Sequence, residues 1–222
     1  YIKARIPIPL SISYFFLKRF HSKAEKTLVP TKSMAEKLKD KGFKNIAIWS
    51  RGVDKNIFKP SKVKINNKRK KAVYFGRVSP EKNIEAFLNT NLNIEKIVIG
   101  DGPSLAKLKE EYPEVIFLGE KFGRELSKIV AESDVFVFPS KTDTFGIVII
   151  EALACGVPVA AYPVTGPKDI IEHEVTGYLS DNLDRAIIGA LKINRNNCIQ
   201  ESMKYSWENC SKQFETSLSL IT

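Results

Sequence analysis

From residue 72 onward, short apolar segments alternate with longer amphipathic ones, and this alternation limits the possible folds more than any other feature of the sequence. The apolar segments are rich in β-branched residues and predict strands at 72–75, 96–99, 115–118, 135–138, 158–161 and 177–179. The segments between them predict helices at 81–89, 104–111, 124–132, 146–154, 167–171 and 184–193. Strands that are apolar throughout are typical of a parallel sheet covered on both faces. The sequence therefore predicts an α/β fold, a doubly wound parallel sheet with right-handed crossovers.

Smaller elements flank this series on both sides. Before residue 72 the pattern predicts an extended start at 6–9, a helix at 11–24, a strand at 27–29, a helix at 31–40 and a strand at 46–49. Residues 61–71 read as a basic linker, and one long helix is expected at about 198–218. We therefore divide the chain into four segments, 1–30, 31–71, 72–197 and 198–222.

Basic residues are concentrated in the first third of the chain. Residues 1–72 contain 20 Lys or Arg and 4 Asp or Glu, whereas residues 73–222 contain 15 and 21. A solvated basic face and linker would explain this asymmetry, as would binding to an anionic membrane surface, a nucleic acid or an acidic partner. Nucleic acid is disfavoured, because the basic residues are not interleaved with aromatic residues in a stacking pattern.

The first predicted helix is unusually apolar for a helix that lies alone on a surface. Tyr14, Phe15, Phe16, Leu17 and Phe20 fall within seven positions. Such a helix needs a partner, and a protein surface is favoured over a membrane interface. No apolar run approaches the ~20 residues that span a bilayer. We expect a cytoplasmic protein, either free or peripheral on the inner face of the membrane.

Cysteine and histidine usage bounds the possible cofactors. The three cysteines have no C-x-x-C spacing, and their odd number is typical of reduced thiols in the cytosol. The two histidines are too few for a His-rich metal site, so no metal is expected. The chain also contains no G-x-G-x-x-G run, which argues against a nicotinamide or flavin cofactor. No cofactor is predicted.

Two loops carry side chains suited to an anionic ligand. Ligands of doubly wound sheets bind at the carboxyl ends of strands, near helix N-termini. Loop 76–83 places Arg77 and Lys82 around a predicted helix start at Pro80. Because helix N-termini attract anions, and Arg and Lys suit phosphate, this loop predicts a diphosphate site. The same spacing is explained equally well if Arg77 and Lys82 are ordinary charged residues on the protein surface.

Loop 139–146 opens the helix that carries Glu151. Asp143 precedes this helix, and the backbone N–H groups of Phe145 and Gly146 could hold a second phosphate. Glu151 lies among apolar residues, where a carboxylate is costly unless it is paired or hydrogen-bonded. A ribose diol could supply two hydroxyl donors. The alternative, a Glu on an exposed helix stripe, fits the apolar surroundings poorly.

Four separated motifs occur in order at 76–83 (GRVSPEKN), 100–103 (GDGP), 139–146 (PSKTDTFG) and 151–158 (EALACGVP). Together they resemble the C-terminal half of retaining GT-B-fold glycosyltransferases of family 4, over about residues 27–215. The run 163–167 is similar to members that transfer mannosyl, glucosyl or sulfoquinovosyl groups to lipid acceptors. The resemblance implies a Rossmann-like donor-binding domain at 72–197, with the tail end of a truncated N-terminal domain at 1–30.

The resemblance also implies roles for individual residues, with a nucleotide-diphospho-sugar such as a GDP- or UDP-hexose as donor. Arg77 and Lys82 would hold the diphosphate, and Glu151 would accept the ribose hydroxyls. Asp143 stands where the family has the longer Glu, and would contact hydroxyls of the donor sugar. These four are the catalytic candidates. The implied donor-binding set is Gly76, Arg77, Lys82, Gly119, Asp143, Thr144, Phe145, Gly146, Val148 and Glu151.

The family's N-terminal domain supplies the acceptor site and usually a catalytic His, and His21 is not that residue. Segment 31–71 would join the two domains, and segment 198–222 would brace them. We therefore expect hexosyl transfer with retention to a lipid or glycan acceptor. The chain would be incomplete or inactive alone, with the missing domain supplied in cis or in trans. The alternative is a noncatalytic remnant or partner subunit that binds nucleotide diphosphates without transfer.

Overall fold

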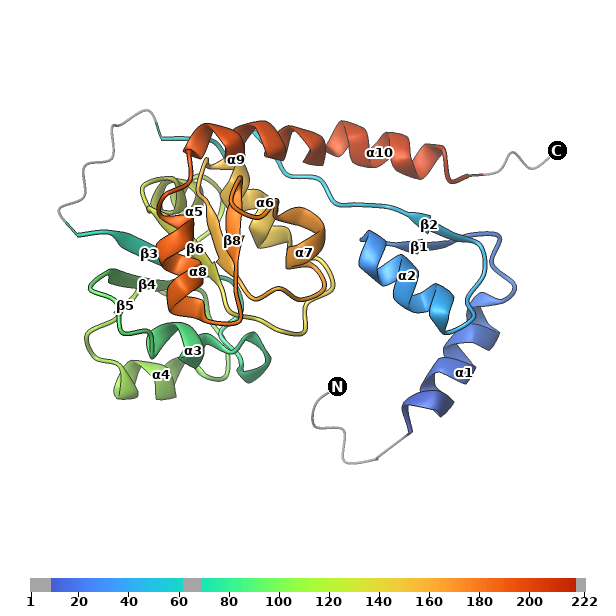
Figure 1. Ribbon diagram of the computed structural model, residues 1–222, viewed down its shortest axis with the longest axis horizontal. Coiled ribbons are helices and arrows are strands. Elements are labelled where there is room, and N and C mark those ends of the chain that lie inside the picture. The colour runs from blue at the N-terminus through green and yellow to red at the C-terminus, as the bar shows by residue number, and fades with distance from the viewer. Residues whose placement is uncertain (1–8, 62–68, 219–222) are drawn as a thin grey trace.

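The computed structural model describes residues 9–61 and 69–218. Its larger part is a six-stranded parallel sheet in the order β5-β4-β3-β6-β7-β8, with helices on both faces (Figure 1). The strands are β3 Lys71–Phe75, β4 Glu95–Ile99, β5 Ile116–Phe117, β6 Val135–Phe138, β7 Val159–Ala161 and β8 Gly177–Leu179. The helices are α3 Ile84–Leu88, α4 Leu105–Glu111, α5 Gly123–Ala131, α6 Ile147–Ala154, α7 Pro167–Ile170, α8 Leu183–Ala190 and α9 Arg195–Ser202. The predicted α/β fold is confirmed.

Alternate residues of the central strands pack into two separate cores. Val73 and Phe75 of β3 face the core formed with α5, α6 and α9. Ala72 and Tyr74 face the core formed with α3, α4 and α8. Both sets are almost fully buried. Because side chains alternate across a strand, this two-sided burial explains why the strands read as continuous apolar runs.

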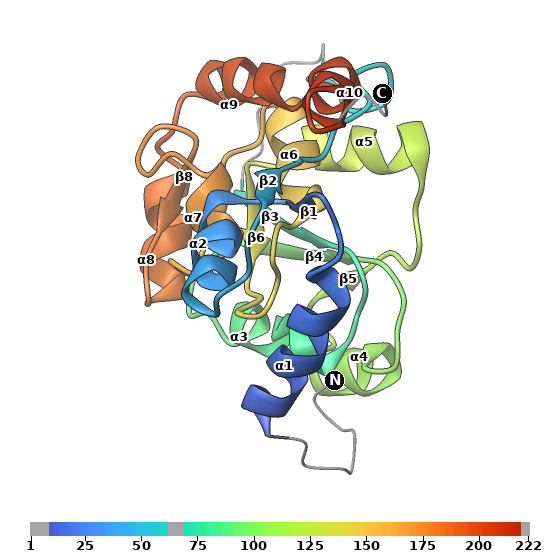
Figure 2. The same cartoon turned by 90° about the vertical axis from the view of Figure 1, so that its right-hand side faces the viewer.

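A smaller unit precedes the sheet. It contains α1 Leu10–His21, β1 Thr27–Val29, α2 Lys32–Asp40 and β2 Ile46–Ile48, and the two strands pair in parallel. The Thr31 hydroxyl caps α2 by accepting from the Met34 N–H at 3.2 Å. Figure 2 shows this unit in front of the carboxyl-end side of the larger sheet. These elements agree with the predicted ones to within a few residues.

Helix α10, Trp207–Glu215, runs along one side of the molecule toward the smaller unit (Figure 1). The single helix predicted at 198–218 is wrong. Helix α9 ends at Ser202, a 3₁₀ turn covers Met203–Tyr205, and Ser206 is extended and caps α10. The break has a physical cause, because the Tyr205 carbonyl accepts the Val53 N–H at 2.8 Å and is turned out of the helix.

The helix predicted at 81–89 is also wrong in part. Pro80–Lys82 form a 3₁₀ turn, Asn83 has a left-handed backbone with φ 54°, and α3 begins at Ile84. Asn tolerates this conformation better than most residues. Its side chain donates to the Pro139 carbonyl at 3.0 Å, which joins the two loops singled out in the sequence. The predicted extended segment before Pro9 and most of the basic linker lie outside the described residues.

Two further expectations can be compared with the structure. Cys155, Cys198 and Cys210 are free and buried. In the part of the chain that the structure describes, no helix is long and apolar enough to cross a membrane.

Candidate functional site

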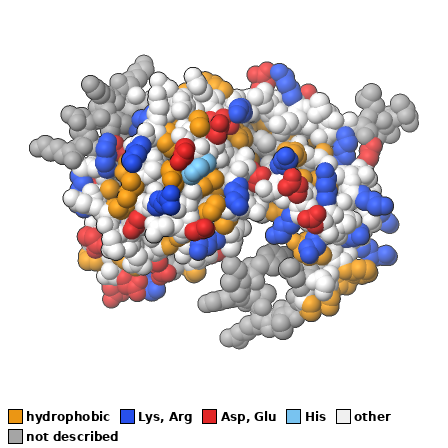
Figure 3. Space-filling view, in the orientation of Figure 1, with side chains coloured by type: hydrophobic (Ala, Val, Ile, Leu, Met, Phe, Trp, Pro, Cys, Tyr) orange, Lys and Arg blue, Asp and Glu red, His pale blue; other side chains and the backbone are white. Residues whose placement is uncertain are grey.

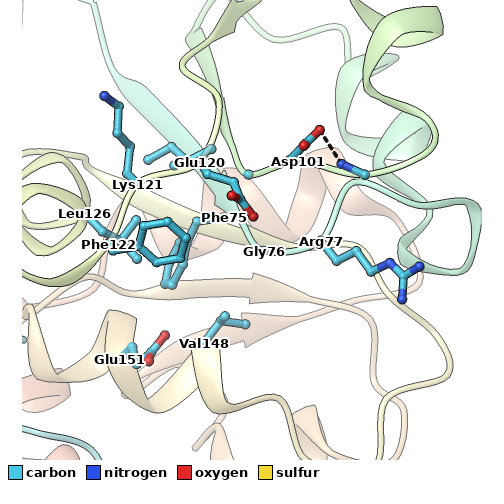
Figure 4. Close-up of a pocket in the computed structure, with 13 residues that line it drawn as sticks. Phe75, Gly76, Arg77, Asp101, Glu120, Lys121, Phe122, Leu126, Val148 and Glu151 are labelled. Carbon is cyan, nitrogen blue, oxygen red and sulfur yellow. Dashed lines mark hydrogen bonds between the residues drawn. The ribbon is translucent and has the colours of Figure 1, made fainter.

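Two adjoining cavities lie at the carboxyl ends of β3, β4 and β6. The larger, of about 560 Å³, is lined by residues from β3, the loops after β4 and β5, α5 and α6. The smaller, of about 390 Å³, lies between loops 76–82 and 143–147 and also touches the smaller unit. Residues shared by both are Phe75, Gly76, Arg77 and Val148. The two cavities therefore form one crevice, whose larger half is shown in Figure 4.

Hydrogen bonds to its backbone fix loop 76–82, which lines this crevice. Gly76 has φ 136°, and its N–H donates to the Ile99 carbonyl at 3.0 Å. The Tyr74 hydroxyl donates to the Arg77 carbonyl at 2.7 Å. Burial, with the negative charge of Asp143, raises the pKa of Tyr74 well above its usual range, so this donor stays protonated. The Arg77 side chain is exposed and extends away from Glu151 (Figure 4).

The glycines of loop 100–103 allow it to pack directly on loop 76–82. Gly100 has φ 137°, and a Cβ added there would overlap the Gly76 carbonyl oxygen. A Cβ at Gly102 would overlap the Val78 carbonyl in the same way. The Val78 N–H also donates to the Asp101 carbonyl at 2.8 Å. This turn is therefore needed for the position of the loop that carries Arg77.

We predict that Gly100→Ala lowers the free energy of unfolding by about 3 kcal/mol or more, because it combines backbone strain with a clash against main chain. Gly119→Ala is the matched control. Gly119 also has a positive φ, of 68°, but a Cβ there would meet nothing within 4 Å, so the expected cost is about 1 kcal/mol. Urea unfolding measures both. Equal losses in the two variants would contradict the packing role of Gly100.

Lys82 and Asp143, 61 positions apart, meet in the smaller cavity. The Lys82 ammonium lies 2.6 Å from Oδ1 of Asp143. The second carboxylate oxygen, Oδ2, is buried and has no hydrogen-bond partner among the described residues. A buried acceptor without a donor is costly, and a hydroxyl would satisfy it. The pair therefore combines a cation with an unsatisfied acceptor, on two residues that line one pocket.

The start of α6 forms another part of the smaller cavity. Gly146 precedes the helix with φ 90°, and Phe145, Gly146 and Ile147 line the pocket. The backbone N–H groups of these three residues make no hydrogen bond within residues 9–61 and 69–218. Such groups at a helix start carry a partial positive charge and favour an anion. The N–H groups predicted to bind phosphate thus make no hydrogen bond within the described residues, and they belong to residues that line the crevice.

Glu151 lies one turn further along α6 and points into the larger cavity (Figure 4). Burial raises the pKa of its carboxyl to about 7. In the described part of the chain, no hydrogen bond or ion pair reaches its carboxylate. Glu151 lies in the middle of α6 and is half-buried, and its charged form gains most from a ligand that donates hydroxyls.

The structure brings nine of the ten predicted donor-binding residues to the crevice. Gly76, Arg77 and Val148 line both cavities, Glu151 lines the larger one, and Lys82, Asp143, Thr144, Phe145 and Gly146 line the smaller one. Gly119 lines neither, and its carbonyl instead accepts the Gly100 N–H at 2.8 Å. Within the described residues, no group of three or more His, Cys, Asp or Glu could hold a metal ion.

Several lining residues were not predicted as site residues from the sequence. Lys121, Phe122 and Leu126 line the larger cavity, and Phe122 is 72% exposed. A bulky aromatic residue in a strand-to-helix loop was the available signal for Phe122. Pro30 of the smaller unit and Arg51 of the segment after β2 line the smaller cavity. No local pattern in the sequence indicates that these two residues reach the crevice.

Comparison with known proteins relates this chain to glycosyltransferases. Residues 55–200 match the family Glycosyl transferases group 1. A GDP-mannose-dependent alpha-mannosyltransferase of Corynebacterium glutamicum is 36% identical over 182 residues, which cover 78% of this chain and 44% of that protein. Sulfoquinovosyl transferase SQD2 of Arabidopsis thaliana is 32% identical over 179 residues, with coverages of 72% and 35%. The chain thus spans less than half the length of these relatives.

The fold is likewise shared with solved structures. HepE of Anabaena, crystallised in complex with UDP, superposes with a TM-score of 0.78 at 20% sequence identity. The match covers 93% of this chain and 67% of HepE. The architecture is therefore that of GT-B glycosyltransferases, as the sequence motifs implied.

Proposed function

This chain belongs to the group 1 glycosyl transferases, and we propose on that premise that its crevice binds a nucleotide-diphospho-sugar and supports hexosyl transfer. One observation carries the proposal. The half-buried carboxylate of Glu151 without a donor, helix-start residues with free N–H groups, and the cations Arg77 and Lys82 line a single crevice at the carboxyl ends of the strands. These groups match the ribose, the phosphates and the sugar of such a donor.

The base and ribose would occupy the larger cavity. Glu151 would accept the two ribose hydroxyls, and Phe122 offers an apolar ring surface at the same cavity. The diphosphate would lie at the junction of the two cavities, near Gly76, Arg77 and the start of α6. This arrangement leaves the smaller cavity for the sugar, next to Asp143, with Lys82 lining the same cavity beside the diphosphate.

Transfer with retention of configuration would break the bond between the sugar and the diphosphate and form a bond from the sugar to an acceptor hydroxyl oxygen, which releases its proton. Negative charge then grows on the departing diphosphate, where Arg77, Lys82 and the α6 N–H groups would stabilise it. Asp143 Oδ2 would accept a sugar hydroxyl and so position the donor. Donor candidates are GDP- and UDP-hexoses, and the acceptor class is a lipid or a glycan.

The surface of the smaller unit would meet a partner. Phe15, Phe16 and Phe20 of α1 are 63%, 64% and 78% exposed. Figure 3 shows hydrophobic side chains gathered over α1, beside Lys and Arg side chains. Covering them with a further domain, in cis or in trans, would complete an acceptor site. Binding of the chain to anionic vesicles would instead assign this face to a membrane.

Calorimetric titration of the chain with GDP and UDP tests the proposal. We expect binding of at least one diphosphate, much tighter than binding of the corresponding nucleoside, with weak or no sugar transfer by this chain alone. Binding without transfer, even when an acceptor domain is present, would favour a noncatalytic partner subunit. Equal affinity for nucleoside and diphosphate would contradict the assignment of the crevice.

A further inference from the structure

A third cation lines the smaller cavity, and it comes from outside the α/β unit. Arg51 lies in the segment that connects β2 to β3, and it reaches the same pocket as Arg77 and Lys82. It is half-buried and does not line the larger cavity. Arg51 therefore faces the part of the crevice assigned to the sugar, and not the part assigned to the base.

Local contacts fix the Arg51 side chain in this position. Its guanidinium lies 4.9 Å from the centroid of the Trp49 ring, a cation–π distance. Nη1 donates to the carbonyls of Trp49 and Ser50, at 3.1 and 3.2 Å. Both hydrogen bonds use Nη1, and within the described residues Nε and Nη2 make none. The N–H groups of Nε and Nη2 therefore remain available to donate hydrogen bonds to a ligand.

The far end of the chain holds the segment around Arg51. The Ser50 N–H donates to the Gln213 side chain at 2.9 Å, and the Cys210 thiol donates to the Ser50 carbonyl at 3.3 Å. The Trp49 ring packs on Phe214 with centroids 5.3 Å apart. All three contacts come from α10, which lies beside this segment in Figure 1. Helix α10 thus positions the third cation of the smaller cavity.

The charges in the smaller cavity indicate what Arg51 binds. Asp143 already neutralises Lys82 at 2.6 Å, which leaves Arg51 and Arg77 as the cations without an ion pair among the described residues. Two guanidinium groups suit the charge of a diphosphate, and each can bind phosphate oxygens through a fork. Arg77 lines both cavities, whereas Arg51 lines only the one on the sugar side.

We infer that Arg51 binds the donor phosphate that carries the sugar, and that it thereby selects nucleoside diphosphates over monophosphates. This inference rests on the proposed function of the crevice. Arg77 meets both phosphates and supports affinity for either ligand. Arg51 recognises the second phosphate alone, so its contribution is absent when a monophosphate binds.

Calorimetry on Arg51→Gln tests this selectivity. We expect an affinity loss of about tenfold or more for the nucleoside diphosphate, as for one charge-assisted hydrogen bond, with less than a twofold change for the monophosphate. Arg51→Lys keeps the charge without the fork and should lie between the two. Arg185→Gln, an exposed Arg on α8 away from the crevice, is the control and should change neither affinity.

The outcomes separate the inference from the proposed function. An unchanged ratio of diphosphate to monophosphate affinity in Arg51→Gln overturns the role of Arg51, provided that the wild type prefers the diphosphate. A wild type without that preference overturns the proposed function itself. Urea unfolding of each variant identifies a loss of fold. If Arg51→Gln is unfolded, the ratio measured for Arg51→Lys decides, and an unchanged ratio there overturns the inference.

Discussion

Replacing Arg77 and Lys82 together by alanine is expected to weaken the binding of GDP or UDP at least a hundredfold. Both side chains line the cavity at the proposed diphosphate position. A hydrogen bond to a charged group contributes about 1.5–3 kcal/mol, so the loss of two amounts to about 3–6 kcal/mol. Each 1.4 kcal/mol corresponds to about a factor of ten in affinity. Calorimetric titration of the wild type and the double variant measures the effect.

The Lys82–Asp143 ion pair allows a second comparison of nucleotide affinities in the same experiment. Removing Lys82 alone leaves the Asp143 carboxylate uncompensated next to an anionic ligand, so Lys82→Ala is expected to bind more weakly than Lys82→Ala/Asp143→Asn. Arg185→Ala/Lys192→Ala removes two cations from the distant α8 region and is the control for net charge. A crevice variant that binds as tightly as this control would refute the diphosphate site.

Glu151 is expected to make the stability of the free protein fall as the pH rises from about 4.5 to 7. Burial raises the pKa of its carboxyl from 4.5 to about 7, so between these values the folded state binds a proton that the unfolded state has released. The contribution is complete below pH 4.5 and is lost as the pH passes 7. It amounts to about 3 kcal/mol at most. Glu151→Gln removes this dependence and should be more stable than the wild type at pH 8.

The same residue predicts the opposite trend for ligand binding. Ribose hydroxyls bind best to the charged carboxylate, so nucleotide affinity should rise as the pH passes 7, by up to about tenfold. The phosphate of the ligand titrates too, near pH 6, and Glu151→Gln corrects for this because it retains only the phosphate contribution. Chemical denaturation and calorimetry at pH 6 and pH 8 check both trends. Identical pH profiles for the wild type and Glu151→Gln would exclude this role.

Local patterns in the sequence predicted most of the site. Loops that follow apolar strands of a parallel sheet must meet at one edge, so Arg77, Asp143 and Glu151 could be assigned to one crevice before their positions were known. The partial burial of Glu151 agrees with the apolar residues around it. These predictions depend on where each strand ends and on hydrophobic periodicity, which short segments encode.

Other features depend on contacts between distant segments and have no local signature. The ion pair of Lys82 with Asp143 joins two loops, and the hydrogen bond from Val53 to Tyr205 interrupts the C-terminal helix. Arg51 reaches the crevice because α10 packs beside it. Helix propensity summed over 198–218 reports only on these residues. It cannot detect that a contact with the distant segment around Val53 makes one residue extended, and one continuous helix was therefore predicted.

Hydrogen–deuterium exchange in the presence of a saturating nucleoside diphosphate tests the central claim most directly. If the diphosphate binds in this crevice, exchange of the backbone N–H groups at 145–148 and 76–77 should slow, because the ligand supplies acceptors that those at the start of α6 lack. The exchange rates of the backbone N–H groups in α4 and α8 should change little. Slowed exchange at α1 or α8, with residues 145–148 unchanged at saturation, would contradict the account.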